Sequence, residues 1–203
     1  MICFERADAL HAHEKALRAI QVTDADTLCA YLKGFWEFIY NHKMFGCVYD
    51  IYSDDIELYR ENGFVLHSIE EVEHETMNLC AAFPDLQVHI ADIFAVPSGE
   101  EEYRVWMRYY FTGTNKAYSI YGAPTDQKLE GEKIINLSDY HVWKIDGEWL
   151  IVLERTMHPC DYIRAVCAGD TSFTKLETRY RKMAAAGTAR EESISTLAVL
   201  SQY

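Results

Sequence analysis

The chain has 203 residues, of which 49% are hydrophobic and 13% aromatic, and it carries a formal net charge of −13 at pH 7. This length and apolar content are typical of one compact domain with terminal extensions rather than of two full domains. The negative charge argues against nucleic acids and anionic membranes as partners, because both repel an acidic surface.

The cysteine pattern and the N-terminal residues predict a cytoplasmic protein. The six cysteines show no CxxC motif or other paired spacing, so we expect reduced, mostly buried thiols. The first residues, MICFERADAL, carry charge at once, and no stretch is long and apolar enough to cross a bilayer. We therefore expect neither a signal peptide nor a membrane span.

Two helices are predicted at the start of the chain, over 3–20 and 24–43. The second has the clearer pattern, with Thr23 or Asp24 as its cap. Its large apolar side chains recur at helical spacing, namely Leu28, Leu32, Phe35, Trp36 and Ile39. Residues 44–55 predict a short helix and a turn.

A strand pair and a third helix come next. Residues 56–68 predict a strand, an Asn-Gly turn at 62–63 and a second short strand. Ser68, with Glu71 three residues later, is a capping box, and it predicts a helix that ends before Pro84.

Further strands are predicted at 87–96 and 103–114. A loop from Gly113 to Gly131 follows them, and its length and terminal glycines suit either a lid or a rigid edge or dimer contact. Beyond the last strands, 171–187 predicts another helix that Gly187 ends.

The stretch 136–158 predicts a hairpin with its turn at Asp146 and Gly147, the strongest short hairpin signal in the chain. With a three-residue connection, Glu154 shares a face with Asn136, Ser138 and Tyr140. With a two-residue connection, Asp139 and His141 join Glu154 instead. In either register Glu154 lies among polar partners, at a solvent-facing surface or in a pocket.

Helices followed by a run of strands predict an α+β fold. A sheet with helices on one face must curl around them, and the mouth of such a curl is a natural pocket. We expect three parts: an N-terminal helical extension over 1–23, the main domain over 24–158 and a C-terminal extension, mainly helical, over 159–203.

Several strings resemble one known family in the right order. FPDLQV at 83–88 resembles the segment after the third helix of SnoaL-like polyketide cyclases. FTGTNKAYSIYGAPTD at 111–126 resembles their "TGTHTG…G.PPTG" loop, with Asn115 in the histidine position and Asp126 in place of the last glycine. Arg108 matches an arginine of the family, and the closing hairpin is also similar. The resemblance covers residues 24 to 158.

This family belongs to the nuclear transport factor two-like superfamily. The resemblance therefore implies a strongly bent antiparallel sheet that forms a cone with three or more helices, commonly as a homodimer. It also implies that a carboxylate on the last strand removes a proton next to a carbonyl group. Glu154 is the nearest match, although it is Glu where the family has Asp. Asn136, Ser138, Tyr140 and Arg108 are then candidates to stabilise the enolate oxygen.

A second branch of the superfamily, the scytalone dehydratases, is similar at HVWKIDGEW. The comparison implies roles for Tyr40, Tyr59 and His89, the last as a second acid or base. Asn41 stands where that branch has Asp, and an amide can neither act as a base nor orient a histidine by charge. Asp50 lies nearby in the sequence and could compensate.

Each candidate also has a structural interpretation. His89 fits a bonded structural histidine as well as a catalytic one, and Tyr40 and Tyr59 fit ordinary core aromatics. Arg108 fits an ion pair with Glu154 or Asp139, which would lower the pKa of the acid and weaken it as a base.

The prediction is a cofactor-independent lyase or isomerase, of cyclase or dehydratase type, that acts on a hydrophobic ring-bearing carbonyl compound. Glu154 and His89 are the catalytic candidates, and the substrate-binding candidates are Tyr40, Asn41, Tyr59, Arg108, Tyr110, Asn136, Ser138 and Tyr140. We expect no metal, because His11 and His13, although close to Glu14, fall on different helix faces. The alternative is a non-catalytic small-molecule-binding or dimeric assembly module of the same fold.

Overall fold

The computed structural model describes residues 2–60, 63–131, 135–157 and 160–170. The turn predicted at 62–63 lies partly outside this range, and the helix predicted over 171–187 lies wholly outside it. No helix in these segments is both long and apolar enough to span a membrane.

The helices follow local signals. Helix α1 spans Ile2–Arg18 and α2 spans Ala25–His42, and the five apolar residues that predicted α2 are all buried. Of the two candidate caps, Asp24 is the N-cap of α2, and its carboxylate accepts a hydrogen bond from the amide of Thr27 at 2.8 Å. A short 3-10 helix, η1, follows at Phe45–Asp50.

Helix α3 spans Ile69–Ala82 and begins where the capping box predicts. The Ser68 hydroxyl accepts a hydrogen bond from the Glu71 amide at 3.4 Å. The Glu71 carboxylate reaches one residue further back than expected and accepts from the amide of His67 at 2.7 Å.

The sheet has seven strands: β1 (Tyr52–Arg60), β2 (Val65–Leu66), β3 (Gln87–Gly99), β4 (Glu102–Thr114), β5 (Lys128–Glu130), β6 (Asn136–Ile145) and β7 (Glu148–Met157). The strand order is β2-β1-β7-β6-β4-β3, with β5 paired to the end of β4. Strand β5 lies within the segment predicted as a loop.

The sheet is mixed rather than purely antiparallel. Strand β1 pairs parallel with β7, and every other pairing is antiparallel. The sequence pattern could not show this, because β1 and β7 are separated by α3 and five other strands. The parallel pairing brings β1, which precedes α3 in the chain, beside the last hairpin of the described residues.

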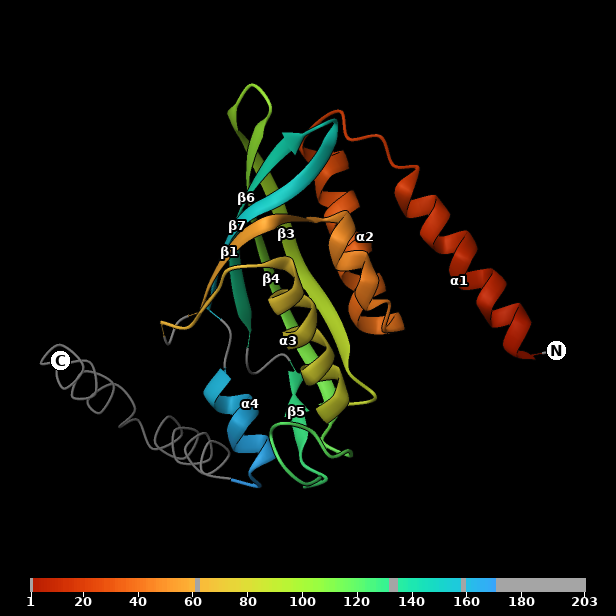
Figure 1. Cartoon of the computed structure of the whole chain (residues 1–203), viewed down its shortest axis with the longest axis vertical. Coiled ribbons are helices and arrows are strands. Elements are labelled where there is room, and N and C mark those ends of the chain that lie inside the picture. Colours follow the sequence, from red (N-terminus) through yellow and green to blue (C-terminus); the bar gives the residue numbers. More distant parts are fainter. Residues whose placement is uncertain (1, 61–62, 132–134, 158–159, 171–203) are drawn as a thin grey trace, which may run out of the picture.

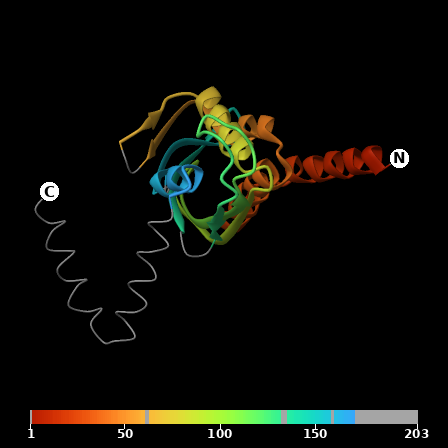
Figure 2. The same ribbon diagram turned by 90° about the horizontal axis from the view of Figure 1, so that it is seen from below.

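The sheet curls into an α+β cone around α2 and α3 (Figure 1). Helix α4 (Cys160–Cys167) lies across the open end of the curl when the molecule is viewed from below (Figure 2). Helix α1 extends away from this body (Figure 1), and Leu17 near its end is buried against Gly34 of α2. The cone interior therefore faces α2 and α3 at the side and α4 at its mouth.

Candidate functional site

The register of the β6–β7 hairpin combines features of both predicted alternatives. The connection has two residues, since Ile145 pairs with Glu148, and both turn residues have positive φ, 52° at Asp146 and 93° at Gly147. Further along the hairpin, the register shifts between His141 and Val142.

This shift is a β-bulge that turns Glu154 inward. Val142 pairs with Ile151 and His141 with Leu153, so Val152 has no opposite residue. Beyond the bulge, Tyr140 pairs with Glu154, as a three-residue connection would have it. Ser138, Tyr140 and Glu154 consequently share the concave face, and Asp139 and His141 lie on the convex face.

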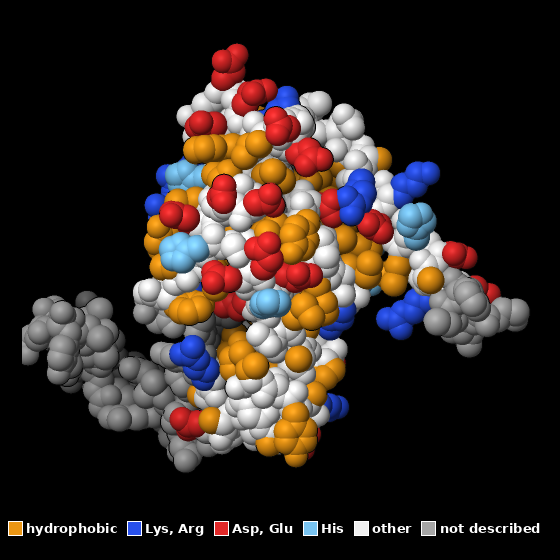
Figure 3. Space-filling view, viewed as in Figure 1, with side chains coloured by type: hydrophobic (Ala, Val, Ile, Leu, Met, Phe, Trp, Pro, Cys, Tyr) orange, Lys and Arg blue, Asp and Glu red, His pale blue; other side chains and the backbone are white. Residues whose placement is uncertain are grey.

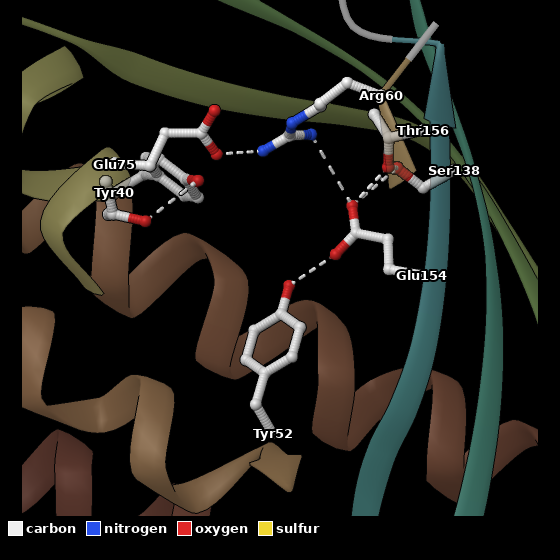
Figure 4. A network of polar contacts seen from close by, with 8 residues as sticks. Tyr40, Tyr52, Arg60, Glu75, Ser138, Glu154 and Thr156 are labelled. Carbon is white, nitrogen blue, oxygen red and sulfur yellow. Dashed lines mark hydrogen bonds and ion pairs between the residues drawn. The ribbon is translucent and has the colours of Figure 1, made fainter. Parts of the chain in front are cut away.

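Glu154 is a buried acid, with 1% of its surface exposed. The Tyr52 hydroxyl donates a hydrogen bond to Oε2 at 2.9 Å, and the Ser138 hydroxyl donates one to Oε1 at 3.3 Å (Figure 4). The Thr156 hydroxyl donates to the same Oε1, and the Arg60 guanidinium lies 3.9 Å from it. Three strands, β1, β6 and β7, thus converge on one carboxyl group.

The Arg60 guanidinium links Glu154 to α3. One of its terminal nitrogens pairs with Glu75 of α3, and the other faces Glu154 (Figure 4). Burial lowers the pKa of Arg60, but the carboxylates of Glu75 and Glu154 outweigh that effect and hold its pKa raised. Arg60 is therefore charged, and its guanidinium group interacts with two carboxyl groups at once.

Burial raises the pKa of Glu154 above its ordinary value of 4.5, while Arg60, Thr156 and Tyr52 act in the opposite direction. Desolvation, followed by the nearby Glu154 charge, raises the pKa values of Tyr52, Tyr109 and Tyr140 well above their ordinary value. The tyrosines are thus neutral hydrogen-bond donors, and Glu154 is a weaker acid and stronger base than an exposed glutamate.

Some polar atoms on the concave face remain without a hydrogen bond. In the described part of the chain, these are Nε of Arg60, Oδ1 of Asn136 and the hydroxyl of Tyr140. Burial and then the charge of Glu154 raise the pKa of Tyr140, and the nearby Ser138 hydroxyl lowers it, but the Tyr140 hydroxyl has no described partner with the geometry of a full hydrogen bond. Buried polar groups are rarely left unbonded, so such groups beside a carboxyl group mark a candidate site.

The concave face holds part of the predicted set. Asn136, Ser138, Tyr140 and Glu154 all lie there and are buried. Tyr40 of α2 is half-buried nearby, and its hydroxyl lies 3.5 Å from the Thr76 hydroxyl. These residues are the ones that the structure brings together.

Other predicted residues lie away from Glu154. On the convex face, His89 bonds the Thr112 hydroxyl at 2.9 Å and stacks on Tyr110. Arg108 is also exposed on that face and pairs with Asp92 rather than with Glu154 or Asp139.

Tyr59 and Asn41 likewise make contacts elsewhere. Tyr59 is exposed, and its hydroxyl donates to Glu57 at 2.8 Å. The Asn41 side chain bonds both the amide (2.7 Å) and the carbonyl (3.3 Å) of Val88, so it ties α2 to β3. Asp50, the suggested substitute for an acid at 41, pairs with Arg18 instead.

Tyr52, Arg60, Glu75 and Thr156 were not predicted as site residues. The sequence did contain a signal for Arg60. Ile56, Leu58 and Arg60 occupy alternate positions of one strand and so share a face, and Ile56 and Leu58 are apolar and buried. An arginine in register with buried residues must have a partner. The partner itself could not be read locally, because it depends on the parallel β1–β7 pairing.

A cavity of about 310 Å³ opens between α3, β2, α4 and the tip of the 115–127 loop. Its inner wall includes Tyr40, Glu75 and Thr76, so Glu75 faces the cavity on one side and Arg60 on the other. Glu154 lies behind this wall and is not part of the lining.

The 115–127 loop is anchored at its base. The buried Asn115 side chain donates to the carbonyl of Ala82 at 3.1 Å and accepts from the amide of Thr125 at 2.9 Å. The Thr125 hydroxyl donates to the carbonyl of Val166 in α4 at 2.9 Å. Asp126, at the position of a family glycine, has a φ of 58°, in the region that favours glycine.

No described group of three or more His, Cys, Asp or Glu side chains is placed to hold a metal ion. The polar atoms around Glu154 instead suit an organic ligand or substrate with hydrogen-bond acceptors and donors.

No family model matches the chain, and no curated protein matches it. A solved protein with a cystatin-like fold from Caulobacter vibrioides is 10% identical, with a TM-score of 0.52 over 69% of this chain and 92% of its own. A protein from Kribbella flavida is 10% identical, with a TM-score of 0.52 over 68% of this chain and 95% of its own.

A protein described as a SnoaL-like polyketide cyclase, from Jannaschia sp. CCS1, is 13% identical, with a TM-score of 0.44 over 61% of this chain and 77% of its own. At these identities the likeness concerns the fold alone. The chain has the cystatin-like, nuclear transport factor two-like fold.

Proposed function

We propose that the protein is a cofactor-independent lyase or isomerase in which Glu154 removes a proton next to a carbonyl group of a hydrophobic, ring-bearing compound. The observation that carries this proposal is a desolvated carboxyl group beside buried donors that have no hydrogen bond in the described chain. If Glu154 had only a structural role, the buried donors around it would be expected to be hydrogen-bonded.

The chemistry follows from the charges. A carboxylate held in low dielectric accepts a proton more readily than one in water, which brings its pKa closer to that of a general base at neutral pH. The developing enolate oxygen needs donors, and the Tyr140 hydroxyl and Nε of Arg60 are the available ones. Arg60 would also stabilise the negative charge as it moves from Glu154 to the substrate.

Access to Glu154 runs through the cavity wall. A substrate in the 310 Å³ cavity is separated from Glu154 by the Glu75–Arg60 pair. Reaction therefore requires the Glu75–Arg60 pair to move aside, and Tyr118 and Ile120 at the loop tip are largely exposed.

Exchange of α-protons in D₂O tests the proposal without knowledge of the natural substrate. Cyclic ketones such as 2-tetralone are incubated with the wild type and with Glu154→Gln, and loss of the α-proton signal is followed by NMR. We expect wild-type exchange to exceed that of the variant by about 100-fold or more. Glu73→Gln serves as the control, because it changes a glutamate of α3 that is not part of the Glu154 network, and it should catalyse exchange at the wild-type rate.

Equal exchange rates for the wild type and Glu154→Gln over a panel of ring ketones would overturn the proposal. Tyr140→Phe adds a second test, because a lost enolate donor slows exchange whereas a lost structural contact does not.

A second proposal concerns assembly: the convex face of the sheet joins two copies of the chain. This face exposes large apolar side chains, namely Phe94, Leu137, Trp143 and Met157. It also carries the ion pairs Arg104–Asp139 and Arg108–Asp92. A face that carries both charge signs can pair with itself around a twofold axis, and aromatic, Met and Arg side chains are enriched in interfaces.

A further inference from the structure

The cavity between α3, β2, α4 and the loop tip has a lining with a definite chemical character. Aliphatic side chains form part of the wall, contributed by Leu66, Leu79, Ile120 and Ile163. Three aromatic rings join them, those of Tyr40, Phe64 and Tyr121. The rings come from α2, the residue before β2 and the loop, so aromatic side chains approach the cavity from several parts of the fold.

The charged groups of the cavity are unbalanced. Glu71 and Glu75 line it together with Arg164 and His74, and Glu75 is bonded through Arg60 to Glu154, which is buried behind the lining. Three carboxylates therefore meet two guanidinium groups, and one negative charge is left over when these five are ionised and histidine is counted as neutral. A partly buried excess charge is costly, and a bound group of opposite sign reduces that cost.

The surroundings favour the same sign. Acidic side chains are spread over the face that carries α3, above the level of α4 (Figure 3), and the whole chain has a formal net charge of −13. A field of this kind attracts cations and repels anions. Aromatic faces also bind cations, and they do so best where water is excluded.

We propose that this cavity is a binding site for an organic cation with an apolar body, such as a protonated primary amine on a ring, whose ammonium group lies beside Glu75. The aliphatic wall buries the body, the rings contact the charge by cation–π interaction, and Glu75 accepts a hydrogen bond while it stays paired to Arg60. The proposal does not require Glu154 to be a base, and binding is measured without turnover.

Calorimetric titration with three ring compounds tests the charge preference. The probes are benzylammonium, benzyl alcohol and benzoate, which share a phenyl ring and differ in charge, and the buffer contains no amine. We expect benzylammonium to bind at least about tenfold more tightly than benzyl alcohol, and benzoate most weakly. Equal affinities, a preference for benzoate or no saturable binding of benzylammonium would overturn the proposal.

Two variants test which side chain causes the preference for benzylammonium over benzyl alcohol. Glu75→Gln should remove most of the tenfold difference and leave the affinity for benzyl alcohol unchanged. Because Glu75 also pairs with Arg60, Glu71→Gln provides a change on the same wall that spares that pair, and it should reduce the preference to a smaller extent.

Glu73→Gln removes the same charge from α3 outside the cavity, so it controls for net charge and should keep the wild-type preference. If Glu73→Gln lowers the preference as much as Glu75→Gln does, the selectivity comes from the general field of the protein, and the site proposed here is wrong.

Discussion

Glu154 is an acid whose folded surroundings favour its neutral form, because burial raises its pKa more than Arg60 and the hydroxyl donors lower it. Between pH 4.5 and the folded pKa, the folded chain keeps a proton that the unfolded chain has released. The stabilisation from this proton is complete below pH 4.5 and is lost as the pH rises through the folded value.

Glu154→Gln removes this titration. We expect the free energy of unfolding of the wild type, minus that of the variant, to fall from pH 4.5 upward by at most about 1.4 kcal/mol per pH unit. Urea unfolding of both proteins from pH 4.5 to pH 8 measures the difference. A difference that stays constant or grows with pH would mean that Glu154 is not desolvated.

Two tyrosines beside Glu154 permit a matched comparison of hydroxyl groups. Tyr52→Phe removes a donor at 2.9 Å from the carboxylate, and we expect a loss of about 1.5–3 kcal/mol. Tyr140→Phe removes a hydroxyl with no hydrogen bond in the described chain, and we expect a change below about 0.5 kcal/mol. Urea unfolding at one pH distinguishes them, and equal losses would show that Tyr140 is a structural donor.

Among the elements, the β6–β7 hairpin has the largest effect on the site, because its turn and bulge together decide which side chains face inward. The turn sets the pairing of Ile145 with Glu148, and the bulge at Val152 then moves Glu154 to the concave face. Without that extra residue, the register set by the two-residue turn would place Asp139 opposite Glu154.

Gly147→Ala tests the turn. Gly147 has a φ of 93°, which an alanine adopts only with strain, although its Cβ would meet no other atom. We expect a loss of about 1 kcal/mol in the free energy of unfolding. Gly46→Ala is the control, since its Cβ is also unobstructed and its φ is not positive. Equal stability of the two variants would mean that the turn conformation differs.

At the scale of the whole molecule, the cone has two sides with different chemistry. The concave side holds the Glu154 network and leads to the cavity, and the convex side exposes apolar side chains between ion pairs. The proposed dimer would cover the convex side and leave the cavity open, since the cavity is formed by α3, β2, α4 and the loop.

Leu137→Asp tests the dimer. Leu137 is 44% exposed on the convex face and pairs with Met157, so a charge there should weaken self-association by about tenfold or more. Sedimentation equilibrium measures the effect. Tyr118→Asp is the control, because Tyr118 is 81% exposed at the loop tip. A wild type that sediments as a monomer would refute this interface.

Local sequence determined much of the fold. The spacing of apolar residues predicted α2, the capping box predicted the start of α3, and Asp146-Gly147 predicted the hairpin, because each signal acts over a few neighbouring residues. The resemblance to SnoaL-like cyclases led to the prediction of a cone-shaped fold. It also led to the prediction of Glu154, Ser138 and Tyr140 as site residues, and these three are buried on the concave face.

Only the tertiary structure decided which polar side chains meet. The parallel pairing of β1 with β7 brings Arg60 to Glu154, and the bulge brings Tyr140 opposite it. The convex position of His89 likewise follows from the register of β3 with β4. Strand register and the pairing of distant strands depend on burial across the whole sheet, so short-range sequence patterns do not specify them.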